Sequence, residues 1–113
     1  MSKIITRAQV QEKLRNKTSI IIDVRNPNEF ENGSIPTAIN IPLSNLEKAV
    51  FEKDSLYSDD LLQKVTKSLD AEIVVYCQSG KRAGKALILL QQEPFQYKNV
   101  LNYEGSWSEW SRY

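Results

Sequence analysis

The fold of this protein follows from one stretch of its sequence, EIVVYCQSGKR, which spans residues 72–82. The first half, Glu72–Tyr76, is a run of β-branched and aromatic side chains that predicts a strand buried on both faces. The second half is polar, and from Gly80 to residue 92 small and apolar side chains recur along one face of a predicted helix. A buried strand that leads through a short loop into a helix is typical of a parallel α/β sheet.

Strands and helices alternate in the same way along the rest of the chain. Strands are expected at residues 4–5, 19–24, 38–40, 72–76 and 99–102. Helices are expected at residues 8–15, 27–32, 44–51, 59–68, 80–92 and 106–110, the first three capped by Thr6, Asn26 and Ser44. This alternation predicts an α/β fold with helices on both faces of a parallel sheet. The active site of such a fold lies outside the carboxyl ends of the strands, here just after Val24 and just after Tyr76.

Length and composition limit the organisation of the chain. Its 113 residues are the size of one domain, so we expect a single domain over residues 1–113. A hydrophobic content of 41% is enough for one core without a disulfide or a metal. The net charge of +1 argues against nucleic-acid binding, and no apolar run approaches the roughly 18 residues that span a membrane. The N-terminus has no signal or transit pattern, so we expect a cytoplasmic protein.

The cysteine and histidine counts limit the chemistry. Cys77 is the single cysteine, so an internal disulfide is impossible, which fits a reducing compartment. The chain has no histidine, and this excludes Ser-His and Cys-His nucleophilic pairs and most catalytic zinc sites. Catalysis therefore has to use the cysteine, carboxylates, Lys, Arg, Tyr or backbone amides.

Cys77 occupies a position that favours a reactive thiolate. It lies at the start of a helix, where unpaired N–H groups and a partial positive charge stabilise a negative sulfur. Gly80 allows the loop to curl so that several amides point inward and form an anion nest. Lys81 and Arg82 stand in the first helical turn, where a positive charge costs a few tenths to about 1 kcal/mol. Cations placed against the helix dipole indicate a functional site for an anionic substrate.

Each of these residues also has a purely structural interpretation. A lone cysteine after a buried strand is often an inert core residue, Gly80 is compatible with a tight turn alone, and Lys81 and Arg82 with a solvated face. Their combination at one loop favours a nucleophilic site. Arg82 follows Cys77 by five positions (82 − 77 = 5), whereas cysteine phosphatases have the arginine one position further on. The tighter loop suits a single sulfur atom better than a phosphate.

Three segments, taken in order, resemble the rhodanese (thiosulfate sulfurtransferase) family, and most nearly its small single-domain eukaryotic members. They are DVR, EF, GSIP and AINIP within residues 23–42, the loop CQSGKR at 77–82, and NYEGSWSEW at 102–110. The resemblance covers nearly the whole chain. Two positions depart from it, because the family often has His where Ser34 stands and Gly where Thr37 stands.

The resemblance implies a five-stranded parallel sheet flanked by helices and a catalytic Cys77 that carries sulfur as a persulfide. Thiosulfate is the implied donor, and glutathione, a protein thiol such as thioredoxin, or cyanide is the implied acceptor. No cofactor and no metal are implied, and we expect a monomer with no nucleic-acid or membrane partner. The implied substrate-binding residues are Gln78, Ser79, Gly80, Lys81 and Arg82. Asp23 and Arg25 are implied structural supports, and an Arg25–Glu29 ion pair is expected.

Three other functions remain open on the sequence. One is a phosphatase or arsenate reductase of related fold, against which the loop length argues. Another is a non-catalytic rhodanese-like binding module, in which the cysteine is commonly lost, whereas Cys77 is present here. The third is a sulfur relay that shares the persulfide chemistry and differs only in its partners.

Overall fold

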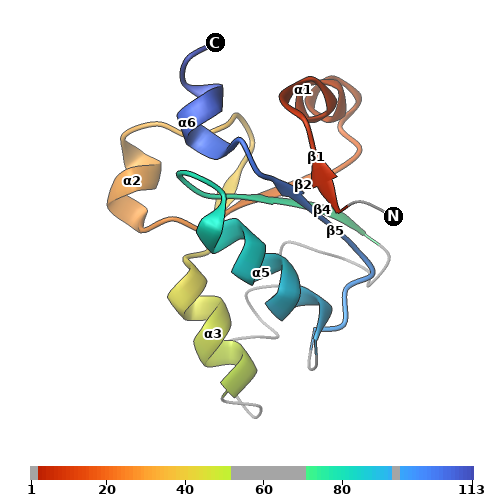
Figure 1. Cartoon of the computed structure of the whole chain (residues 1–113), viewed down its shortest axis with the longest axis vertical. Helices are drawn as coiled ribbons and strands as arrows, with labels where there is room; N and C mark the ends of the chain where they lie inside the picture. Colours follow the sequence, from red (N-terminus) through yellow and green to blue (C-terminus); the bar gives the residue numbers. More distant parts are fainter. Residues whose placement is uncertain (1–2, 52–70, 93–94) are drawn as a thin grey trace.

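The computed structural model describes residues 3–51, 71–92 and 95–113 of the chain (Figure 1). The strands are β1 (Ile4–Ile5), β2 (Ile20–Asp23), β3 (Ile39–Asn40), β4 (Glu72–Tyr76) and β5 (Asn99–Tyr103). The helices are α1 (Arg7–Asn16), α2 (Pro27–Glu31), α3 (Leu43–Phe51), α5 (Lys81–Gln91) and α6 (Ser106–Trp110).

Within these residues five strands form one sheet in the order β1-β5-β4-β2-β3, and all neighbouring strands are parallel. The predicted α/β fold with a five-stranded parallel sheet is therefore confirmed. In the pairing of β2 with β4, Asp23 lies opposite Tyr76. The Val24 amide then donates to the Tyr76 carbonyl at 3.0 Å, so the two strands leave the sheet side by side. This places the residues after β2 next to the residues after β4.

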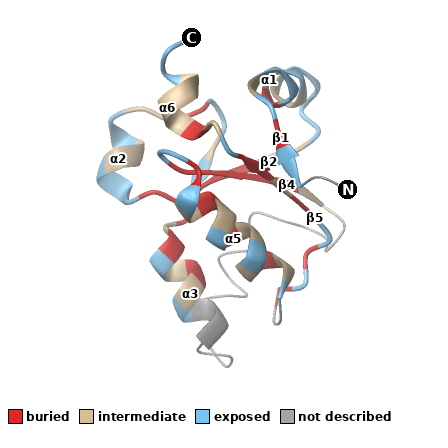
Figure 2. Ribbon diagram, viewed as in Figure 1, coloured by how far each residue is buried: buried red, intermediate tan, exposed pale blue. Residues whose placement is uncertain are grey.

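Helices cover both faces of the sheet, as Figure 1 shows, and the central strands β2 and β4 are buried along most of their length (Figure 2). Successive side chains of β4 point to opposite faces. Ile73, Val75 and Cys77 belong to the core that α3 and α5 close, whereas Val74 and Tyr76 belong to the core that α1 and α6 close. Both faces of β4 are thus apolar, which explains its uninterrupted hydrophobic sequence.

The predicted element boundaries agree with the structure most closely at β1, β4 and α6, whose limits match. The capping role predicted for Ser44 is wrong, since α3 already begins at Leu43 and Ser44 lies inside it. The Pro42 carbonyl accepts hydrogen bonds from the amides of Asn45 and Leu46, at 2.9 and 3.3 Å, so the helix starts two residues earlier than a cap at Ser44 would place it. The helix expected at residues 59–68 lies outside the described residues.

One backbone position explains a departure from the family pattern. Thr37 has a φ of +67°, in the left-handed region that a β-branched residue rarely adopts. Glycine adopts this region without steric cost, which accounts for the glycine that the family often has at this position. The connection between α2 and β3 keeps the glycine-type turn although it carries threonine.

Candidate active site

The loop after β4 holds Cys77 at the predicted position, at the carboxyl edge of the sheet and before α5. The residue is 0% exposed. The amide of Gly80 donates a hydrogen bond to the Cys77 Sγ at 3.0 Å, so the loop turns back on its own sulfur. A backbone N–H directed at a sulfur is the kind of contact that an anion nest would make, and it agrees with the loop geometry expected from the sequence.

Gly80 is required by the geometry of this loop. Its φ is +100°, in the region that favours glycine, and it is the N-terminal cap of α5. A Cβ atom built on Gly80 would lie 2.7 Å from the Glu104 carbonyl oxygen, which is backbone that cannot move aside cheaply. The connection between β5 and α6 therefore packs directly on the turn that directs an amide at Cys77.

Helix α6 holds the outer side of the loop. The amides of Trp107 and Ser108 donate to the carbonyls of Cys77 and Gln78, each at 2.9 Å. These are amides of the first helical turn, which have no partner within the helix, so the loop carbonyls satisfy them. In a trans peptide unit the N–H points away from the C=O. With these carbonyls turned to α6, the amides of Gln78 and Ser79 face the opposite way, as an anion nest requires.

Ser106 is a site residue that is not among those predicted from the sequence. It is fully buried, and its Oγ accepts from the Cys77 amide at 3.1 Å and donates to the Tyr103 carbonyl at 2.9 Å. The same Oγ lies 3.9 Å from the Cys77 Sγ. Its φ of +56° is unusual for serine, and such strain is often retained at functional sites. The only signal in the sequence is its place in the C-terminal segment at 102–110.

The two cations of the loop have different surroundings. Lys81 is exposed and has no ion pair with any described residue. Arg82 forms a two-point ion pair with Glu29 of α2, with N–O distances of 2.8 and 3.1 Å. The hydrogen bonds from Arg82 lower the pKa of Glu29 to about 2, and those to Glu29 raise the pKa of Arg82. The expected Arg25–Glu29 pair is wrong, because α2 presents Glu29 to α5 instead.

Arg25 pairs with Asp23, and both side chains are buried, with 2% and 0% of their surface exposed. The Arg25 guanidinium donates to Asp23 Oδ2 at 2.7 Å and to the Gly33 carbonyl at 2.6 Å. It also lies 5.2 Å from the centre of the Trp107 ring, and Trp107 belongs to the helix that holds the Cys77 loop. The pair therefore connects the end of β2 to α6, in a position that suits a structural support.

Tyr76 fills the space under this pair. Burial raises the pKa of its hydroxyl well above the usual range, and a hydrogen bond to Asp23 acts in the same direction. The hydroxyl also accepts from the Ile35 amide at 3.0 Å. A neutral tyrosine thus bridges the buried carboxylate and the α2–β3 connection.

The structure brings the predicted site residues to one edge of the sheet. Gln78 and Ser79 are exposed at the turn, Gly80 is buried, and Cys77 lies behind them. Asp23 and Arg25 lie at the end of the neighbouring strand β2. The arrangement combines a buried thiol, the Gly80 amide directed at its sulfur, and the exposed Lys81, which has no ion pair with the part of the chain that the structure describes.

Comparisons with known proteins support the family resemblance. The model of the rhodanese-like domain matches residues 6–113. The chain is 30% identical to the Homo sapiens thiosulfate:glutathione sulfurtransferase, over 94% of this chain and 90% of that protein. It is 39% identical over 97 residues to a Schizosaccharomyces pombe relative whose name places it among mitochondrial thiosulfate sulfurtransferases. The chain covers 66% of the length of that relative and 40% of a Mycobacterium leprae one.

A solved structure gives the same result for the fold. The human single-domain sulfurtransferase TSTD1 superimposes with a TM-score of 0.80 and 30% identity, over 99% of this chain and 97% of that chain. The prediction of an enzyme of the sulfurtransferase type agrees with the names of these relatives. The match over residues 6–113, together with the loop geometry, shows that the chain belongs to the rhodanese-like domain family.

Proposed function

We propose that this protein transfers a sulfur atom from thiosulfate to a thiol through a persulfide on Cys77. The observation that supports this most directly is the 3.0 Å hydrogen bond from the Gly80 amide to the Cys77 Sγ. It lies in a loop whose carbonyls are turned outward to α6, so that its amides are available to a second sulfur atom. The names of the relatives support thiosulfate as the donor.

The reaction has two nucleophilic steps. In the first, the Cys77 thiolate attacks the outer sulfur of thiosulfate, a new S–S bond forms, and the bond to the sulfonate sulfur breaks with release of sulfite. In the second, an acceptor thiolate attacks the outer sulfur of the persulfide. The S–S bond to Cys77 breaks, and Cys77 returns as a thiolate. No electron acceptor is required, because the outer sulfur moves between nucleophiles.

The charges at the entrance suit this chemistry. Lys81 attracts the thiosulfate dianion and steadies the departing sulfite, and its lack of an ion pair within the described residues leaves it available. Arg82 contributes positive charge from within its pair with Glu29. Because Cys77 is buried, the donor sulfur has to pass the exposed residues Gln78 and Ser79 to reach it.

Intact-mass spectrometry after incubation with thiosulfate tests this function. We expect a gain of one sulfur atom, which cyanide or glutathione then removes with formation of thiocyanate or glutathione persulfide. The Cys77→Ser variant should fold, since the serine is nearly isosteric, and should gain no sulfur. Sulfur gain by that variant, or none by the wild-type chain from any sulfane-sulfur donor, would contradict the proposal. Hydrolysis of p-nitrophenyl phosphate without sulfite release from thiosulfate would favour the phosphatase alternative.

Several expectations stay predictions. They are the single domain over residues 1–113, the monomeric state, the independence of a cofactor and the cytoplasmic location. Among the described residues, no helix has the length and apolar character needed to cross a bilayer. The name of the fission-yeast relative includes a mitochondrial location, so fractionation of tagged protein is the measurement that decides the compartment.

A further inference from the structure

Arg25 and Arg82 both lie at the edge of the sheet that carries Cys77, and each is paired with a carboxylate. The Arg25–Asp23 pair is closed to solvent, with 2% and 0% of its side chains exposed. The Arg82–Glu29 pair is partly open, with 33% and 27% of its side chains exposed. A partly exposed ion pair contributes little to stability, whereas a buried pair opens only at a large cost. Of the two pairs, the second is therefore the one that can exchange its carboxylate for an anion from solvent.

Arg82 belongs to the turn that surrounds the sulfur. It stands two positions after Gly80 (82 − 80 = 2), whose amide donates to the Cys77 Sγ at 3.0 Å. The hydrogen bonds to Glu29 are the largest cause of the raised pKa of Arg82, and the charge interaction with Cys77 acts in the same direction. The guanidinium is thus close enough to the sulfur for its charge to act on an anion that is bound there.

Glu29 keeps a hydrogen-bond partner when Arg82 leaves it. Its Oε1 accepts from the Arg82 guanidinium at 2.8 Å and also from the Asn26 amide at 3.1 Å. Asn26 is the N-terminal cap of α2, so the second bond forms within that helix terminus and does not depend on α5. Because the carboxylate is partly exposed, water can take the place of the guanidinium. The departure of Arg82 therefore leaves no buried charge without a partner.

We propose that Glu29 is a positioning residue of the sulfur-transfer reaction: the sulfonate end of the donor displaces it from Arg82, and it returns to Arg82 as sulfite leaves. The inference rests on the proposed function. Arg82 binds the sulfonate oxygens through the two nitrogens that hold Glu29 in the free protein. The carboxylate competes with the donor and with sulfite alike, so it weakens the binding of both and shortens the time that sulfite occupies the site. The exchange involves hydrogen bonds only, and no covalent bond changes in it.

This competition explains why a site for an anionic donor holds a carboxylate. Lys81 is exposed and has no ion pair with a described residue, so it attracts any anion. Arg82 is released only to an anion that can replace both of its hydrogen bonds to Glu29. Sulfonate, sulfite and sulfate carry several oxygens on one centre and meet this requirement, whereas chloride and cyanide do not. The pair thus selects oxyanions.

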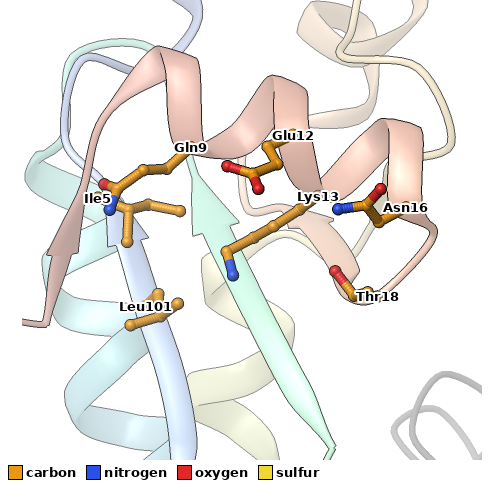
Figure 3. Close-up of a pocket in the computed structure, with 7 residues that line it drawn as sticks. All are labelled: Ile5, Gln9, Glu12, Lys13, Asn16, Thr18 and Leu101. Atoms are coloured by element: carbon orange, nitrogen blue, oxygen red, sulfur yellow. The ribbon is translucent and has the colours of Figure 1, made fainter.

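A second ion pair of similar exposure supplies a matched control. Lys13 of α1 pairs with Glu72 of β4 at 2.6 Å, and 21% and 33% of these side chains are exposed. Lys13 lines a separate hollow of about 290 Å³ between α1 and strands β1 and β5 (Figure 3). No residue of the Cys77 loop is among the described residues that line it. Glu72→Gln therefore frees a cation as Glu29→Gln does, but at the opposite end of β4 from the sulfur.

The test uses the single cysteine as a reporter of anion binding. The alkylation rate of Cys77 by iodoacetamide is measured against sodium sulfate concentration, with the ionic strength held constant by sodium chloride, and the KM for thiosulfate is measured with cyanide as acceptor. We expect Glu29→Gln to lower the half-protecting sulfate concentration and the KM about three- to fivefold, since the anion no longer breaks an ion pair. Glu31→Gln, at an exposed carboxylate of α2, and Glu72→Gln should change both by less than about twofold. In an Arg82→Ala background, Glu29→Gln should have no further effect.

The outcomes separate this inference from the proposed function. A purely structural Glu29 would leave anion binding unchanged or weaker when it is replaced, so an unchanged or raised KM and half-protecting concentration in Glu29→Gln would overturn the exchange. An effect that persists in the Arg82→Ala background, or no protection by sulfate in either protein, would overturn it as well. A wild-type chain that gains no sulfur from thiosulfate would overturn the proposed function instead. Sulfate protection requires no sulfur transfer, so it still decides whether an oxyanion displaces Glu29.

Discussion

The loops that follow β2 and β4 leave the same edge of the sheet side by side, yet they treat their charges in opposite ways. After β2, Asp23 and Arg25 are buried against each other, and their hydrogen bonds are closed within the protein. After β4, Cys77 is buried with the Gly80 amide on its sulfur, and Lys81 is exposed without an ion pair to the described residues. The charged groups of the first loop are paired with each other. The second loop has a backbone amide directed at the sulfur and an exposed lysine, and both suit the binding of an anion.

The difference shows how a site with a single reactive atom keeps its geometry. A buried charge without a partner is costly, so the β2 loop depends on the ion pair and hydrogen bonds between Arg25 and Asp23. That loop contacts Trp107 of α6, and α6 in turn holds the carbonyls of Cys77 and Gln78. The rigid pair thus stabilises the position of the loop that carries Cys77.

The largest expected effect is a loss of stability when the Asp23–Arg25 ion pair of the β2 loop is removed. Arg25→Met leaves the carboxylate of Asp23 buried and unpaired, so we expect a loss of roughly 3–5 kcal/mol in the free energy of unfolding, measured by urea denaturation. The control is Lys13→Met, which breaks the partly exposed pair with Glu72 and should cost no more than about 1 kcal/mol. Equal losses in the two variants would show that the Asp23–Arg25 pair has no special structural role.

A second prediction concerns the reactive side. Lys81→Ala should raise the KM for thiosulfate about tenfold while changing the free energy of unfolding by less than about 0.5 kcal/mol. Arg82→Ala should also raise the KM, but by less, because Glu29 already occupies the guanidinium. Lys85→Ala, one turn further along α5, is the control that should leave the KM unchanged. An unchanged KM in both Lys81→Ala and Arg82→Ala would remove the anion-binding role of this loop.

A smaller effect on stability is expected in the connection between α2 and β3. This connection includes the Gly33 carbonyl that Arg25 binds, and Thr37 follows it. Thr37→Gly should raise the free energy of unfolding by about 0.5–1 kcal/mol, since it relieves the φ of +67° at some cost in chain entropy. Thr18→Gly is the matched control at an exposed position that is not among the positive-φ residues, and it should lower stability slightly. If Thr37→Gly lowers the free energy of unfolding, the contacts of the threonine side chain stabilise the protein by more than its strained backbone destabilises it.

The smallest effect depends on pH and concerns the Glu29–Arg82 pair. The folded-state pKa of Glu29 is lowered to about 2 from 4.5, so the pair contributes fully above about pH 4.5 and loses its contribution as the pH falls toward 2. Glu29→Gln should therefore be less stable than the wild type at pH 6 by up to about 1 kcal/mol, and the difference should shrink at pH 3. The urea midpoints of both proteins at the two pH values measure it, and a difference that grows on acidification would contradict the pairing.

Much of the fold and part of the site are predictable from the sequence because they depend on local pattern. The strand at 72–76 follows from its β-branched run, and the position of Cys77 follows from that strand and the helix after it. The local pattern does not predict which residues pair with the charged and polar side chains. Glu29 and Arg82 are 53 positions apart, and Cys77 and Ser106 are 29 apart, so no periodicity relates them.

The sequence by itself therefore determined the alternation of strands and helices, and the edge of the sheet at which Cys77 and the candidate site lie. The tertiary structure alone decided which cation of the loop has no ion pair within the described residues, and which hydroxyl lies against the sulfur. The reason is physical: periodicity records which face of an element is buried, whereas the partner of a polar group is chosen by the packing of distant elements that must satisfy it.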